Sequence, residues 1–128
     1  MKRVMMNSDT FFLPLTSSQP SQLLISAEEL SAIQPSIKME TPDDLPPIPI
    51  KAIDGIMAMT DRHTRAYAAC LAGMTTVPLI WDEDDLDWDA YRICVAWCLD
   101  EEIQQISDLA SRVIDSQAFE TFWLGHCQ

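Results

Sequence analysis

The sequence predicts a mostly α protein, a small bundle of three to four helices from about residue 50, preceded by an extended, proline-rich N-terminal arm. Two observations predict this fold class. All but one of the eight prolines lie in residues 1–50, where they prevent long regular elements. After residue 50, apolar residues recur mostly at helical spacing. A chain of 128 residues that is 48% hydrophobic can bury one core, so we expect an arm over residues 1–49 and a helical domain over residues 50–128.

The arm contains two short elements. Residues 11–15 are aromatic and aliphatic but include a proline, which favours an edge strand. Ser26 begins a capping-box pattern, with a glutamate three residues later, and so predicts a short helix over about residues 27–34 that Pro35 ends. The proline-rich residues 42–49 should be extended, because each proline disfavours the helical region for the residue before it.

The next segments alternate between helical patterns and a short connector. Residues 50–59 carry apolar side chains at helical spacing and predict a short helix. Thr60 is expected to cap a second helix from Asp61 to about Ala72, which Gly73 ends. Residues 75–81 have the composition of a strand, but a proline among them makes an extended connector at least as good an interpretation. The second helix carries a stripe of small residues suited to close helix packing: Ala66, Ala69, Cys70 and Gly73.

The C-terminal part predicts the centre of the bundle. Asp87 begins a helix whose residues 93–99 are apolar on every side, including Trp97, so we expect it to fill the core. Asp100 is expected to cap the clearest amphipathic helix, with one apolar face formed by Ile103, Ile106, Leu109, Ala110, Val113 and Ile114. A last aromatic turn follows, made of Phe119, Phe122, Trp123 and Leu124 and ended by Gly125.

Charge and composition exclude several function classes. Twenty acidic against eight basic residues give a net charge of −12, which opposes direct binding to nucleic acid or to anionic lipid. Three glycines leave few loops that could cradle a phosphate. The longest apolar run, residues 93–99, is too short to cross a membrane, and no signal peptide is evident. Four cysteines without a disulfide spacing suggest reduced thiols, and therefore a cytoplasmic protein.

The most conspicuous motif is a run of six acids within eight residues, from Asp82 to Asp89, flanked by tryptophans. A calcium-binding EF-hand loop beginning at Asp85 would have Ala90 at its glycine position and Ala96 at its final glutamate position, so the motif fails. Amphipathic tryptophans beside charge are typical of protein interfaces. We therefore expect a partner-binding segment formed by Trp81, Asp82, Glu83, Asp84, Asp85, Asp87, Trp88 and Asp89.

Other chemistry receives less support. Cys94 and Cys98 are one helical turn apart, and a zinc site would need His126 and Cys127 to return to them, but no CxxC is present. His63 is expected at the surface, in the only concentrated basic neighbourhood, where Lys51, Arg62, His63 and Arg65 would meet an acidic partner. No nucleophile motif accompanies the two histidines. We expect no catalytic residue, no metal and no cofactor.

The predicted function is therefore that of a non-catalytic acidic interaction protein, and not of an enzyme. It would be an accessory subunit, inhibitor or assembly factor, of a phage or mobile-element type, that binds a larger protein or multiprotein assembly. The partner would present a basic groove to the acidic segment and would also contact the N-terminal arm. The alternative is a small helical metal-binding protein or enzyme that uses the carboxylates of residues 82–89, with His63 or His126.

Overall fold

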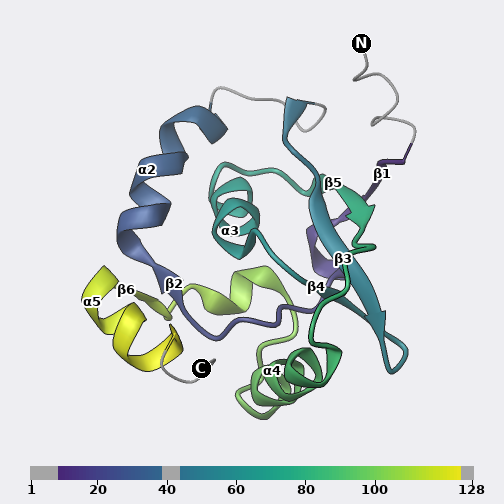
Figure 1. Ribbon diagram of the computed structural model, residues 1–128. Coiled ribbons are helices and arrows are strands. Elements are labelled where there is room, and N and C mark those ends of the chain that lie inside the picture. The colour runs from purple at the N-terminus through teal and green to yellow at the C-terminus, as the bar shows by residue number, and fades with distance from the viewer. Residues whose placement is uncertain (1–8, 39–43, 125–128) are drawn as a thin grey trace.

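The structure, a computed structural model, describes residues 9–38 and 44–124. It is an α/β fold built on a curled, mixed sheet of four strands (Figure 1). The strands are β1 (Phe11–Pro14), β3 (Ile48–Ile53), β4 (Ile56–Met59) and β5 (Thr76–Trp81), in the order β1-β5-β3-β4. β5 pairs antiparallel to β1 and parallel to β3, and β3 pairs antiparallel to β4. The predicted mostly helical bundle is therefore wrong.

The largest local error concerns residues 50–59, which form a β-hairpin and not a helix. Ile53 pairs with Ile56, and the two-residue loop between them has positive φ at both positions, 51° at Asp54 and 84° at Gly55. Positive φ at both loop residues defines the turn that matches the twist of the flanking strands, and Asp-Gly is a favoured sequence for it. Buried Ile48 and Ile50 alternate with the partly exposed Pro49 and Lys51 along β3, which is the period of a strand.

The segment 75–81 is an interior strand and not a connector. β5 lies between β1 and β3, and Val77 and Leu79 are 2% and 1% exposed. Pro78, also fully buried, lies opposite Phe12 of β1. A proline in an interior strand removes a hydrogen-bond donor from the sheet, so the presence of Pro78 favours a connector over an interior strand when the sequence is considered alone. The edge strand expected near residues 11–15 is confirmed as β1.

Two helices pack together on the sheet. α3 (His63–Leu71) lies between the sheet and α2 (Ala27–Lys38) (Figure 1). The small residues Ala66 and Ala69 of α3 are both fully buried, and α2 and α3 pack directly against each other, as the predicted small-residue stripe requires. The predicted end of this helix is confirmed, since Gly73 follows it with a φ of 89°.

The N-terminal segment packs into the core, which corrects the extended arm of the predicted fold class. Leu15, Ile25, Leu30 and Ile37 are at most 7% exposed and belong to the main core cluster. The amide of Glu29 donates to the Ser26 hydroxyl at 3.3 Å, which confirms the predicted cap of α2. α2 nevertheless continues through Pro35 to Lys38, and its last turn buries Ile37. The domain boundary at residue 49 stays a prediction.

The apolar helix expected at the centre of the bundle lies at the edge of the molecule. Asp87 caps this helix, α4 (Trp88–Asp100), as predicted, and its carboxylate accepts the Ala90 amide. Only Val95 and Cys98 are buried, while Trp97 is half-buried. α4 packs mainly against β3, in a small cluster with Ile53, away from α2 and α3 (Figure 1).

The predicted amphipathic helix over residues 101–114 does not form. Its place is taken by a 3-10 turn, η3 (Ile106–Leu109), and by a two-residue strand, β6 (Val113–Ile114), which pairs in parallel with β2 (Ile25–Ser26). Ile103, Ile106 and Leu109 are still at most 1% exposed. These apolar residues are therefore buried, as the sequence predicts, but the backbone that carries them is irregular.

The described chain ends in a helical segment, as the aromatic pattern predicted. α5 (Ser116–Phe119) continues into a π-helical turn, η4 (Glu120–Leu124). Phe119 is buried, whereas Phe122 is 58% exposed. Gly125, expected to end this turn, lies outside the described residues. No helix within residues 9–38 and 44–124 has the length and apolar character that a membrane span needs.

Candidate functional site

Several of the predicted partner-binding acids are used in local structure. The Thr60 hydroxyl donates to Asp82 Oδ2 at 2.6 Å, and the other oxygen of Asp82 accepts the amide of Asp84 at 3.0 Å. Thr60 therefore fastens the acidic segment to the end of β4 and does not cap α3. Asp87 is the N-cap of α4, where a carboxylate satisfies a free helix amide.

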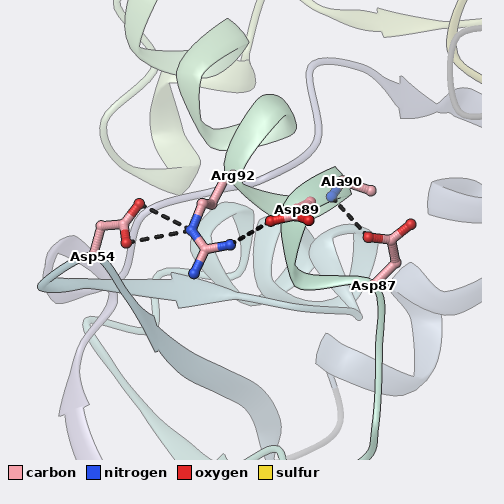
Figure 2. A network of polar contacts seen from close by, with 5 residues as sticks. All are labelled: Asp54, Asp87, Asp89, Ala90 and Arg92. Atoms are coloured by element: carbon pink, nitrogen blue, oxygen red, sulfur yellow. Dashed lines mark hydrogen bonds and ion pairs between the residues drawn. The ribbon is translucent and has the colours of Figure 1, made fainter.

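Asp89 and Trp88 are also engaged within the chain. Arg92 Nη1 donates to Asp89 at 2.6 Å, and its Nε donates to Asp54 of the hairpin at 3.1 Å (Figure 2). The half-buried Trp88 ring lies 5.4 Å from the Tyr91 ring and 5.1 Å from the Lys51 ammonium. These contacts attach α4 to the β3–β4 hairpin.

The exposed remainder of the predicted site is small. Trp81 is 47% exposed, and Glu83, Asp84 and Asp85 are exposed without an ion pair among the described residues. In residues 9–38 and 44–124, no three His, Cys, Asp or Glu side chains come together as a metal site would require. His126 and Cys127, which the zinc interpretation needed, lie outside these ranges.

A second site, not expected from the sequence, surrounds the first turn of α3. Two hollows of about 460 Å³ and 320 Å³ border this turn. His63 and Asp61 line both of them. We call this region the α3 N-terminal site; its central residues are Asp61, Arg62, His63, Thr64 and Arg65.

His63 is buried, which contradicts the surface position expected for it. Its side chain is 3% exposed, and its Nε2 accepts the main-chain amide of Ser21 at 2.9 Å. Burial lowers the pKa of His63 to about 4, against a smaller opposing effect of Asp61, so the ring is neutral at pH 7. A neutral imidazole that accepts at Nε2 carries its proton on Nδ1. That Nδ1–H is buried and has no hydrogen-bond partner in the described part of the chain.

The arginines of this site are also without acidic partners. Arg62 and Arg65 form no ion pair within the described parts of the chain, whereas Arg92 and Arg112 both do. Arg65 Nε is buried without a hydrogen-bond partner. In a chain of net charge −12, two arginines without ion pairs among the described residues line the same hollow as His63 and concentrate hydrogen-bond donors there.

The backbone adds further donors. α3 has no side-chain cap, because its N-cap residue Arg62 carries only hydrogen-bond donors; the Arg62 backbone lies in the left-handed region with a φ of 63°. The amides of the first helical turn therefore carry the partial positive charge of a helix N-terminus. Asp61 Oδ1 accepts one amide, that of Arg62 at 2.8 Å. The site can chemically bind an oxyanion.

One signal in the sequence pointed to this region. The basic neighbourhood around Arg62, His63 and Arg65 was recognised, but as a contact for an acidic partner. The burial of His63 depends on Ser21, which lies 42 residues away in the chain, and no local pattern indicates that contact.

Comparisons with known proteins bear on the fold. The structure is similar to the crystal structure of protein Atu1540 from Agrobacterium tumefaciens, with a TM-score of 0.54 and 12% identity over 88% of this chain and 68% of that chain. It is also similar to the C-terminally truncated chromosome-partitioning protein ParB from Caulobacter crescentus complexed with CTP-gamma-S, with a TM-score of 0.48 and 22% identity over 71% of this chain. The match spans about half (53%) of that ParB chain. A scan against protein-family models and a search of curated proteins each gave no match.

Proposed function

We propose that the protein binds the phosphate group of a small molecule at the α3 N-terminal site. The observation that carries this proposal is the buried Nδ1–H of His63, a hydrogen-bond donor that finds no acceptor among the residues the structure describes. A buried polar group without a partner costs about 1–3 kcal/mol, and an oxygen of a bound anion would offset that cost. The Ser21 amide donates to Nε2 of His63, so Nε2 must be the unprotonated acceptor and Nδ1 carries the proton that can be donated.

The charges nearby support the same ligand class. Arg62 and Arg65 both line the larger hollow, and neither is neutralised by an ion pair within the described residues. Helix N-termini bind phosphate through free amides and the helix dipole, and arginine matches phosphate oxygens with its planar fork of donors. This mode of binding needs no glycine-rich loop, so the scarcity of glycine in the sequence does not oppose it.

The dimensions of the site favour a phosphorylated molecule over inorganic phosphate alone. The larger hollow, about 460 Å³, lies within the range of about 300–1,000 Å³ that is usual for small-molecule sites. Its wall also contains apolar surface from Ile33 and Phe119. Carboxylates of Glu29 and Asp61 border it and can accept hydrogen bonds from ligand hydroxyl or amino groups.

Isothermal titration calorimetry tests this proposal with inorganic phosphate, pyrophosphate and the four common ribonucleoside triphosphates as probes. We expect saturable binding of at least one phosphate compound by the wild-type protein. Arg65→Gln should weaken it by about tenfold or more, because it removes a charge-assisted hydrogen bond. Arg62→Gln should weaken it in the same direction.

The matched control is Arg112→Gln, which removes the same charge from an arginine outside the site. Binding that falls equally in Arg112→Gln would show a response to net charge and not to the site. No binding of any probe by the wild-type protein would contradict the proposal.

A second proposal retains the predicted protein-interaction function. We infer that the exposed part of the acidic segment, Trp81 with Glu83, Asp84 and Asp85, contacts a basic groove on a larger protein. The specific observation in favour is that these three acids have no internal cation partner among the described residues and lie beside a half-exposed tryptophan. That the protein is not an enzyme, and that it is cytoplasmic, stay predictions.

The test is a pull-down from native lysate at low and high salt, with the triple variant Glu83→Gln, Asp84→Asn, Asp85→Asn. We expect a stoichiometric partner that the variant loses and that high salt releases, because exposed charge pairs are screened. A control is Asp115→Asn, which changes an acid outside the segment. A partner retained equally by the triple variant would refute this second proposal.

A further inference from the structure

The outer face of α4 is an apolar surface that the described residues of the chain, 9–38 and 44–124, leave uncovered. Ile93 and Leu99 are 52% and 39% exposed, and the small Ala96 between them is exposed as well. A neighbouring side of the helix packs on the hairpin through Val95. A helix that is apolar on every side is typical of one that is covered all round. The fold covers one side only, so the other calls for a partner.

The spacing of residues on this face is symmetric about Ala96. Ile93 and Leu99 each lie three residues from it, and Arg92 and Asp100 each lie four residues from it. Two copies of α4 that cross antiparallel at Ala96 therefore place Ile93 against Leu99 and Arg92 against Asp100. A twofold contact of this kind repeats each pair, because residue i meets j while j meets i. The small alanine at the crossing point lets the two backbones approach closely.

The charges on α4 fit this arrangement. Asp100 is exposed, ends the helix, and has no ion pair among residues 9–38 and 44–124. An acid at that end opposes the helix dipole, and α4 has no basic residue in its last turn to compensate. Arg92 uses Nε and Nη1 for Asp54 and Asp89, while its Nη2 has no partner within the described chain and remains free to donate (Figure 2).

We propose that a second copy of this chain covers the outer face of α4 as an antiparallel helix pair, with Arg92 of each copy bonded to Asp100 of the other. The contact goes beyond the proposed phosphate site and shares no residue with its central group. α4 has 13 residues and is about 20 Å long, so the paired surface is smaller than that of a typical stable interface. Two chains of net charge −12 also repel each other. We therefore expect a weak dimer that forms at high protein concentration and tightens as salt screens the repulsion.

Sedimentation velocity of the full chain, from about 1 μM to about 1 mM and at two salt concentrations, measures the dimer directly. Ile93→Glu should abolish dimerisation over this range, because it places a charge in the apolar centre of the contact. The matched control is Leu71→Glu, since Leu71 on α3 is also 52% exposed and the added charge is the same. A wild-type chain that stays monomeric throughout, or equal loss of the dimer in both variants, would overturn the proposal.

A charge reversal tests the register of the pair. Asp100→Arg places cations opposite Arg92 at two symmetric positions and should weaken the dimer by about tenfold. The same substitution lowers the negative charge of each chain, which by itself favours association. Asp84→Arg makes the same change of net charge outside α4, and should leave the dimer unchanged or tighten it. Tightening by Asp100→Arg would refute the antiparallel pairing.

Discussion

The buried His63 makes a quantitative prediction about stability and pH. Its pKa is about 4 in the folded protein and 6.5 in the unfolded chain, because folding removes the ring from water. Between these values the unfolded chain binds more protons, so the free energy of unfolding falls as pH falls through this window. The contribution amounts to about 2 kcal/mol between about pH 7 and pH 5, and to about 3 kcal/mol once the pH is below 4.

The variant His63→Gln isolates this contribution from the titration of carboxylates. Glutamine has a carbonyl oxygen that can accept the Ser21 amide but does not titrate. Urea unfolding followed by tryptophan fluorescence gives the free energy of unfolding for both proteins at several pH values. The stability advantage of the wild-type protein over the variant should shrink by about 2 kcal/mol between pH 7 and pH 5. A difference that stays constant over this range would refute a buried, neutral His63.

Three further predictions concern the core, the hairpin and a thiol. Gly55→Ala should lower the free energy of unfolding, measured with urea, by about 1 kcal/mol. Gly55 has a φ of 84°, and a β-carbon there would meet no atom within 4 Å, so the loss comes from backbone strain and not from a clash. Ile103→Ala should cost about 2–5 kcal/mol by the same assay because Ile103 is 1% exposed, whereas Leu71→Ala at a 52% exposed position should change stability by less than about 0.5 kcal/mol. Cys98 should resist alkylation by iodoacetamide at pH 8 until the chain unfolds, because burial, with a smaller effect of Cys94, raises the pKa of its thiol to about 12. Peptide mass spectrometry measures the alkylation of each cysteine.

Helix ends that depend on local geometry alone follow well from the sequence. Ser26 and Asp87 cap their helices because a side-chain oxygen reaches an amide three residues ahead, which depends on local geometry alone. Gly73 ends α3 for a similar reason, since it adopts a positive φ. Asp54-Gly55 carried a signal of the same kind for the hairpin. It was outweighed by apolar spacing, which a short segment satisfies for either a helix or a strand.

The wrong parts of the fold share another cause. Ile103, Ile106 and Leu109 have helical spacing and are buried, yet η3 and β6 take the place of a helix because β6 pairs with β2, some 88 residues earlier in the chain. Pairing between distant segments adds backbone hydrogen bonds that no local propensity includes. The mostly α class was wrong because β5 pairs with β1 and β3 across long separations in the chain, and each strand has at most six residues, too few to show a clear period.

The candidate phosphate site could not be found from residue types alone, and the backbone at Arg62 shows why. A non-glycine residue in the left-handed region costs about 1–2 kcal/mol, and Arg62 makes no side-chain cap that would offset it. Glycine would adopt this φ without strain and would serve the turn equally well. What arginine adds at this position is a guanidinium in the lining of the hollow that His63 also borders. Strain alone does not mark a functional residue, because Asp54 and Glu102 also adopt a positive φ. The donors that line the hollow together with Arg62 make an anion the ligand that fits.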